Sequence, residues 1–142
     1  MAEEICRGWQ EELGLTVRPR SVAAGELSEA LTGGAFHIAL ITCRADRNDA
    51  EPMLQTWQSG HAENYAQFHS SAYVMLLRVA AASSSAEARD AYLSDAERLL
   101  VEQGSVMPLW FTNSVYRVKS GLAGLSGNGL GVFCFDSVRP TA

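Results

Sequence analysis

AFHIALITCRADRNDAEPMLQTW, residues 35–57, joins an apolar run to a short amphipathic run through a polar turn. The predicted strand, residues 36–42, does not alternate cleanly, because residues 38–41 are all apolar, which indicates a strand covered on both faces, as in a parallel sheet. The polar turn follows at residues 43–49, and Pro52 then suits the first turn of a helix. A buried strand that ends in a charged turn is the usual position of a ligand site in an open α/β sheet.

Length and composition predict one globular domain covering residues 1–142. The chain has 142 residues, of which 47% are hydrophobic and 19% charged, as in ordinary globular proteins. The net charge of −5 indicates no excess of basic side chains for contacts with phosphates, so we expect no nucleic-acid partner. No apolar run approaches the roughly 18 residues of a membrane span. The N-terminus is acidic and amphipathic, so we expect no signal peptide in this chain.

Hydrophobic spacing and cap residues predict alternating helices and strands. The predicted helices cover residues 2–13, 25–31, 53–57, 72–82 and 87–103. The predicted strands and extended segments cover residues 15–17, 36–42, 106–118 and 132–135, with loops at 59–71 and 121–131. The order helix, strand, helix, strand favours right-handed crossover units. The predicted fold class is therefore α/β, with a mixed, mostly parallel sheet flanked by helices.

The two longest C-terminal helices each carry an apolar face, and Ser85 is a predicted N-cap between them. The face of the first comprises Tyr73, Leu76, Leu77 and Ala80. The face of the second comprises Ala88, Tyr92, Ala96, Leu99 and Leu100.

Seven segments, in order and with the right spacing, resemble the C-terminal lobe of the family 5 extracellular solute-binding proteins. These are the dipeptide, oligopeptide and nickel receptors of ABC importers. The matching positions are Trp9 with Leu13–Val17, Leu31–Ile38, Ala45-Asp46 with Asp49 and Met53-Leu54, Asn64-Tyr65 with Tyr73 and Leu76-Leu77, Arg89 with Tyr92 and Ala96-Glu97, Met107-Pro108-Leu109, and Val118-Lys119 with Leu122-Ala123-Gly124.

The resemblance implies a class II periplasmic-binding-protein lobe and places its ligand-facing residues in the polar turn. In peptide-binding relatives, the aspartate that matches Asp46 takes the α-amino group of the peptide. Cys43 stands where relatives often carry a tryptophan that packs on the ligand, and cysteine cannot stack in this way. Arg44 can hold a carboxylate or phosphate through its fork geometry, or be an exposed loop charge. Thr42, at the end of the strand, completes the predicted ligand-binding set.

The resemblance also implies a binding protein rather than an enzyme, working outside the cytoplasm, in the periplasm or anchored to the cell surface. Family members are several times longer and have an N-terminal lobe and an export signal. We therefore interpret the chain as a fragment or a truncated gene product. The implied partners are a peptide or similar small solute, the missing N-terminal lobe and an ABC permease. An orphaned sheet edge also favours a homodimer of the fragment.

Two other function classes remain open at this point: the sensing domain of a transcription regulator, and a small α/β enzyme. For the enzyme alternative, the chain has no recognisable nucleophile motif. The glycine-rich segment Gly127–Gly131 precedes a predicted strand instead of opening a phosphate-binding helix. We expect no cofactor and no metal site, because His37, His61 and His69 lack ligand spacing. Three cysteines that match no zinc motif are expected to be small buried hydrophobes.

Overall fold

The computed structural model describes residues 1–113 and 115–141 and divides into two compact units, residues 1–43 and residues 44–142. We describe each unit by itself. Ser114, which falls in the predicted extended segment, and Ala142, which falls in the predicted single domain, lie outside the described residues. The single domain over the whole chain stays a prediction.

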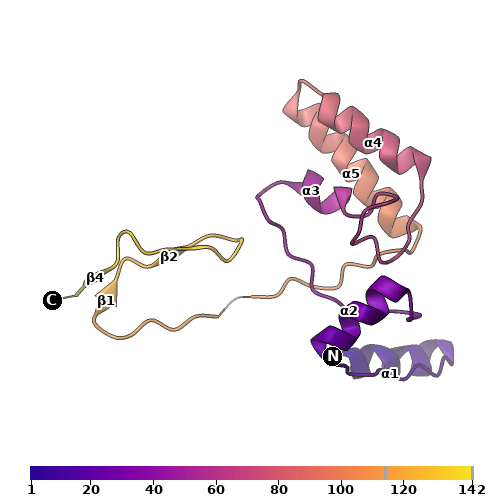
Figure 1. Cartoon of the computed structure of the whole chain (residues 1–142), viewed down its shortest axis with the longest axis horizontal. Helices are drawn as coiled ribbons and strands as arrows, with labels where there is room; N and C mark the ends of the chain where they lie inside the picture. The colour runs from indigo at the N-terminus through magenta and orange to yellow at the C-terminus, as the bar shows by residue number, and fades with distance from the viewer. Residues whose placement is uncertain (114, 142) are drawn as a thin grey trace. The chain divides into compact units, whose positions relative to one another are not determined.

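The first unit contains two helices, α1 (Ala2–Leu13) and α2 (Ala24–Gly33), drawn in indigo and violet in Figure 1. Both were predicted, and α2 is three residues longer than expected. Each ends at a glycine in the left-handed conformation, Gly14 at φ 67° and Gly34 at φ 67°. A side chain beyond Cα is disfavoured there, which explains why glycine ends both helices.

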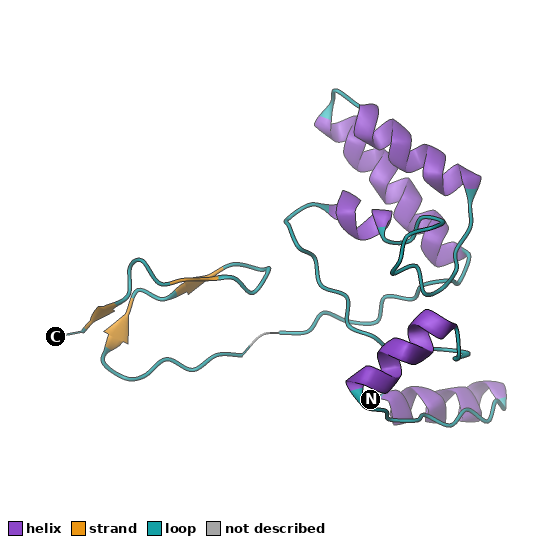
Figure 2. Ribbon diagram, viewed as in Figure 1, coloured by secondary structure: helices purple, strands orange, loops and turns teal. Residues whose placement is uncertain are grey.

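The prediction of strands at residues 15–17 and 36–42 was wrong for this structure. Within the part of the chain that the structure describes, neither segment belongs to a strand ladder, and both are drawn as loop in Figure 2. An apolar run indicates that a segment is to be buried. A strand also requires a neighbouring backbone with which its N–H and C=O groups can form hydrogen bonds. The mostly parallel sheet is therefore not present among the described residues.

The second unit is built on three helices, α3 (Ala50–Gln55), α4 (Ser71–Ala82) and α5 (Ala86–Glu102). The predicted cap is confirmed, because the Ser85 hydroxyl accepts from the backbone N–H of Ala88 at 3.3 Å. Ser70 caps α4 in the same way, accepting from Tyr73 at 3.2 Å. Helices α4 and α5 lie side by side, with α3 against them (Figure 1).

The core of this unit lies between the three helices and the loop before α4. Its buried members are Leu54, Trp57, Phe68, Tyr73, Leu77, Ala80, Leu93, Ala96 and Leu100. The predicted face of α4 is confirmed except that Leu76 is only half-buried. On α5, the predicted face missed Leu93, which is buried. Of the five predicted residues, Ala96 and Leu100 are buried, and Ala88, Tyr92 and Leu99 are half-buried.

Residues 121–141 form two short antiparallel pairs. Strand β1 (Leu122–Ala123) pairs with β4 (Arg139–Pro140), and β2 (Ser126–Gly127) pairs with β3 (Phe133–Cys134). The predicted strand at 132–135 is confirmed in part, whereas the predicted loop at 121–131 contains two strands. Gly124 is required between them, since a Cβ there would lie 1.9 Å from the carbonyl oxygen of Ser137.

In the described residues, no helix is both long enough and apolar enough to cross a membrane. Among the described residues, the secondary structure consists of helices and two small antiparallel sheets.

Candidate functional site

The four predicted ligand-binding residues are close together in the sequence but belong to different units, so each is described within its own unit. Thr42 and Cys43 are the last residues of the first unit, and Arg44 and Asp46 are among the first residues of the second. All four side chains are exposed. The turn leads directly into α3, whose N-cap is Asp49.

Asp46 is available to a ligand from solvent. Its side chain is 72% exposed, and its Oδ1 lies 3.5 Å from Nε of Arg47, which is itself exposed. An ion pair between two exposed side chains contributes little and rearranges readily. A ligand cation can therefore replace Arg47 at this carboxylate without breaking a buried contact.

The carboxylate of Asp49, three residues further on, is held by hydrogen bonds within the fold. One of its carboxylate oxygens accepts from the backbone N–H of Glu51 at 2.9 Å, and both accept from Arg89 of α5 at 2.8 Å. Arg89 also donates to Glu51 at 2.7 Å. All three side chains are half-buried. Arg89 thus fixes the start of α3, and with it the C-terminal end of the turn, to α5.

The hydrogen bond from Arg89, followed by that from the backbone of Glu51, holds the pKa of Asp49 below its ordinary value. A carboxyl group whose pKa is lower in the folded than in the unfolded chain stabilises the fold above its unfolded pKa. That contribution disappears as the pH falls below about 4 towards the lower folded pKa.

We expect Arg89→Met to lower stability at pH 7 and to weaken its dependence on pH below pH 4. The substitution keeps an aliphatic side chain over α5 but removes the partner that lowers the pKa of Asp49. Urea unfolding of both proteins at pH 7 and pH 3 measures this. Arg98→Met is the matched control, because Arg98 pairs with Asp95 on the exposed side of the same helix. An equal loss of stability between pH 7 and pH 3 in wild type and Arg89→Met would contradict the role of Arg89.

Sequence reasoning missed Arg89 as the partner of Asp49. The pair joins residues 40 apart in the sequence, so no local spacing indicates it. The resemblance did place both Asp49 and Arg89 in matching segments. That placement is the one signal in the sequence that pointed to both residues.

The other polar candidates have structural contacts. Asn64 is buried and bonds to the backbone of its own loop. His69 Nδ1 lies 2.8 Å from the hydroxyl of Ser59, and His61 Nδ1 accepts from the N–H of Glu63 at 3.2 Å. Over the described ranges, no three histidine, cysteine or acidic side chains are grouped as metal ligands. The prediction of buried cysteines was wrong for Cys43 and Cys134, which are exposed.

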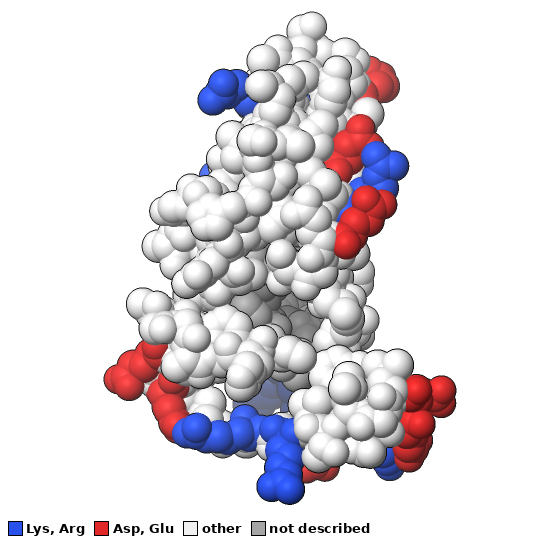
Figure 3. All heavy atoms as spheres, turned by 90° about the vertical axis from the view of Figure 1, so that its right-hand side faces the viewer, with Lys and Arg blue, Asp and Glu red and all other residues white. Residues whose placement is uncertain are grey.

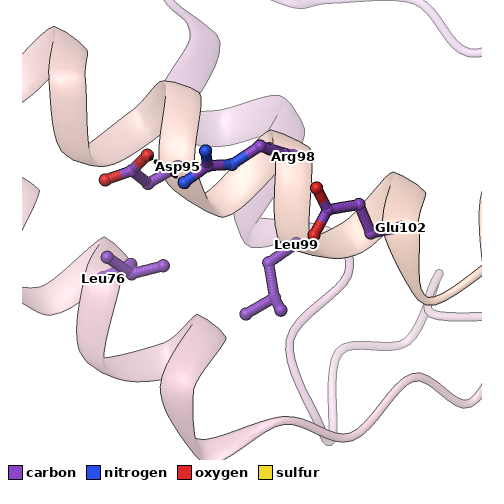
Figure 4. A pocket seen from close by; sticks show the side chains of 5 residues that line it. All are labelled: Leu76, Asp95, Arg98, Leu99 and Glu102. Atoms are coloured by element: carbon purple, nitrogen blue, oxygen red, sulfur yellow. Dashed lines mark hydrogen bonds and ion pairs between the residues drawn. The ribbon is translucent and has the colours of Figure 1, made fainter.

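A depression of about 340 Å³ lies between α4 and α5, away from the turn. Figure 4 shows Leu76 on one side, Leu99 on the other, and the ion pair of Arg98 with Asp95 above them. It is open to solvent and has no buried polar group. On the face in Figure 3, acidic and basic side chains form small groups separated by uncharged surface.

No family model matches the chain. Two curated proteins of Escherichia coli strain K12 are similar to it. The periplasmic murein peptide-binding protein MppA is 25% identical over 114 residues, which are 80% of this chain and 21% of that protein. The probable deoxycholate-binding periplasmic protein YgiS is 26% identical over 116 residues, or 82% of this chain and 22% of that protein. The chain spans about a fifth of the length of these relatives.

Two solved structures are similar as well. The unliganded open form of MppA superposes with a TM-score of 0.70 at 25% identity, covering 73% of this chain and 20% of that one. The peptide-binding pheromone receptor PrgZ superposes with a TM-score of 0.75 at 24% identity, covering 99% of this chain and 27% of that one. At this identity, PrgZ shows a shared fold alone.

These matches confirm the resemblance inferred from the sequence: MppA and PrgZ are both family 5 solute-binding proteins, and the chain corresponds to part of their length. The structural neighbours are proteins of the periplasmic-binding-protein type. The relatives are binding proteins rather than enzymes, and they are periplasmic by name. The alternative as a regulator's sensing domain receives no support from them.

Proposed function

We propose that this chain, a relative of the family 5 solute-binding proteins, supplies one lobe of a receptor outside the cytoplasm. This receptor binds peptides for an ABC importer. The observation that carries the proposal is the contrast between two carboxylates on one turn. Asp49 is held by Arg89, whereas Asp46 is 72% exposed and has only the exposed Arg47 as an ion-pair partner among the described residues. The anchored turn presents an exposed carboxylate, paired only with the exposed Arg47 among the described residues, where the resemblance places the peptide's amino group.

The chemistry of this contact is an ion pair between the Asp46 carboxylate and the α-ammonium group of a peptide. In the closed receptor, the opposing lobe excludes water, so the ammonium needs a charge partner and further acceptors to offset its desolvation. Backbone carbonyl oxygens of residues 44–48 are of the right chemical type for that task, and the hydroxyl of Thr42 stays a predicted acceptor. Arg44 is the candidate for a ligand carboxylate, through a bidentate pair.

Cys43 shapes which peptides fit. A tryptophan at this position would cover the ligand with an aromatic face, and a cysteine side chain leaves that volume empty. We therefore propose a wider and less stacked pocket than in tryptophan-bearing relatives, accepting bulkier peptides or similar small solutes.

One lobe alone leaves a ligand half exposed, so binding to this chain by itself is expected to be weak, with a dissociation constant of about 1 mM or higher. Hinge closure with the second lobe supplies the remaining contacts. Micromolar binding of a tripeptide to the chain alone, measured by calorimetry, would contradict the proposal of a single lobe.

The turn is tested by NMR titration of the chain with a murein tripeptide and with an unrelated tripeptide at millimolar concentration. We expect amide shifts at residues 42–48 that vanish in Asp46→Asn and with N-acetylated peptides, since both changes remove the ammonium–carboxylate pair. Asp90→Asn is the matched control, because it removes the same charge from an exposed position on α5. Shifts that persist in Asp46→Asn, or that occur elsewhere, would overturn the assignment of this turn.

A further inference from the structure

The glycine-rich segment Gly127–Gly131, which the proposed function does not use, spans the end of β2 and the turn that leads to β3. Asn128 closes this turn with hydrogen bonds of both its side chain and its backbone. Its side-chain oxygen Oδ1 accepts from the backbone N–H groups of Leu130 at 3.0 Å and Val132 at 3.1 Å. Its backbone N–H donates to the carbonyl oxygen of Val132 at 3.0 Å, and its own carbonyl oxygen accepts from Gly131 at 3.1 Å. The turn therefore depends on both oxygens of Asn128.

The residue after Asn128 is Gly129, and the two form the single Asn-Gly pair in the sequence. Glycine has no Cβ, so no side chain shields its backbone nitrogen. Among the described residues, the N–H of Gly129 donates to no hydrogen-bond acceptor. A Cβ built on Gly129 would have nothing within 4 Å. The nitrogen of Gly129 is therefore accessible and not engaged, directly beside the side-chain amide of Asn128.

This arrangement favours an intramolecular reaction between the backbone and the side chain. The nitrogen of Gly129 gives its proton to hydroxide ion or water and attacks the side-chain carbonyl carbon Cγ of Asn128. Negative charge then develops on Oδ1, where the N–H groups of Leu130 and Val132 already donate, as the donors of an oxyanion hole do. The new N–C bond closes a succinimide ring, and the side-chain nitrogen takes up a proton and leaves as ammonia. Water then opens the ring at either of its carbonyl groups, which gives aspartate or isoaspartate.

We propose that Asn128 is a site of spontaneous modification, at which the turn between β2 and β3 promotes attack by the nitrogen of Gly129 and converts the asparagine to aspartate and isoaspartate. The two products differ in their effect on the turn. Aspartate keeps the backbone path, and its carboxylate accepts from the same N–H groups. Isoaspartate carries the backbone through the former side chain, which lengthens the turn by one carbon atom and displaces both acceptors. The first product should therefore keep the β2–β3 pairing, and the second should lose it.

The experiment incubates the full chain of 142 residues at pH 8, in buffer and in concentrated guanidinium chloride, and follows conversion by peptide mapping with mass spectrometry. We expect conversion at Asn128 and none at Asn48 or Asn64, because aspartate and tyrosine follow these two. Conversion should be at least about threefold faster in buffer, since unfolding removes the donors that face Oδ1. An Asn128 that stays unmodified would overturn the site. A rate in buffer no higher than in guanidinium chloride would overturn the part played by the turn.

Gly129→Ala tests the attacking nitrogen, because a methyl group beside it hinders the approach to Cγ. The turn has room for this methyl group, and Gly129 is not among the residues with positive φ, so the fold should persist. Conversion should slow at least about tenfold, as small displacements of reacting atoms cost this much or more. Gly8→Ala in α1, where a Cβ also has open space, is the matched control and should leave the rate unchanged. Conversion of Gly129→Ala at the wild-type rate would contradict the mechanism.

The effect on the turn is measured by amide hydrogen exchange, detected by NMR, at residues 126–134. Asn128→Asp supplies the first product directly and should keep the exchange rates of unmodified wild type. In incubated wild type, the signals of the isoaspartate form should exchange faster, because pairing of β2 with β3 protects the amides. Equal exchange in the isoaspartate form and in Asn128→Asp would contradict the proposed loss of pairing. None of these outcomes bears on peptide binding at Asp46, so the inference stands apart from the proposed function.

Discussion

Replacing Tyr73 by alanine is expected to lower the free energy of unfolding of the helical unit by about 3–5 kcal/mol. Tyr73 is fully buried, and its ring meets that of Phe68 edge to face, with centroids 5.1 Å apart. Its hydroxyl donates to the carbonyl oxygen of Leu54 at 2.7 Å, which joins α4 to α3. Alanine removes the ring and leaves a cavity at the meeting point of both helices. Urea unfolding followed by circular dichroism measures the change.

Tyr73→Phe separates the hydrogen bond from the packing. The carbonyl oxygen of Leu54 keeps a second partner, the N–H of Trp57 at 3.1 Å, so loss of the hydroxyl should cost only about 1 kcal/mol. A loss below about 1 kcal/mol for Tyr73→Ala would show that the ring is not at the centre of the core.

The same residue predicts how stability changes in alkaline solution. Burial, and secondarily the charge of Glu97, raises the pKa of Tyr73 above its ordinary value. A group whose pKa is raised by folding stabilises the fold below its unfolded pKa, near 10 for tyrosine, and that contribution is lost as the pH rises beyond it. Tyr73→Phe should therefore weaken the fall in stability above pH 10. An equal fall in the free energy of unfolding above pH 10 in wild type and Tyr73→Phe would contradict this.

Replacing Asn64 by alanine is expected to cost about 2–4 kcal/mol, the second large effect. The buried side-chain amide donates to the carbonyl oxygens of Gln58 at 3.2 Å and Phe68 at 3.0 Å, and it accepts from the N–H of Phe68 at 3.0 Å. It thereby closes the loop that carries Phe68 into the core. Gln67, at φ 50°, depends on this closure because its backbone conformation is uncommon for a residue other than glycine.

Thermal and urea unfolding of Asn64→Ala measure this effect, and Asn48→Ala is the control. Asn48 is exposed in the turn before α3, so its replacement should change stability by no more than about 0.5 kcal/mol. Equal effects of the two substitutions would show that burial of the amide is not what stabilises the loop. Asn64→Asp should lie between them, since a carboxylate keeps the acceptor and loses both donations.

The helices were predictable because their signals are local. The glycine after Leu13 and the serine before α5 act within one turn, and the apolar spacing of α4 gives its buried face directly. Asp46 became a candidate through the resemblance to family 5 receptors, and its role stays a prediction. The contact that anchors its turn was not predictable, because Asp49 pairs with Arg89, 40 residues away in the sequence.

The sequence by itself determined the helices, the glycine and serine caps, the resemblance to family 5 solute-binding proteins, and the polar turn as the candidate site. Only the tertiary structure decided which carboxylate is engaged and which is available, since that depends on the packing of α5 against α3. It also decided that residues 36–42 form no strand in the chain as described. An apolar sequence specifies that a segment must be covered, whereas a strand also requires a second backbone to pair with, and the apolar pattern does not specify that second backbone.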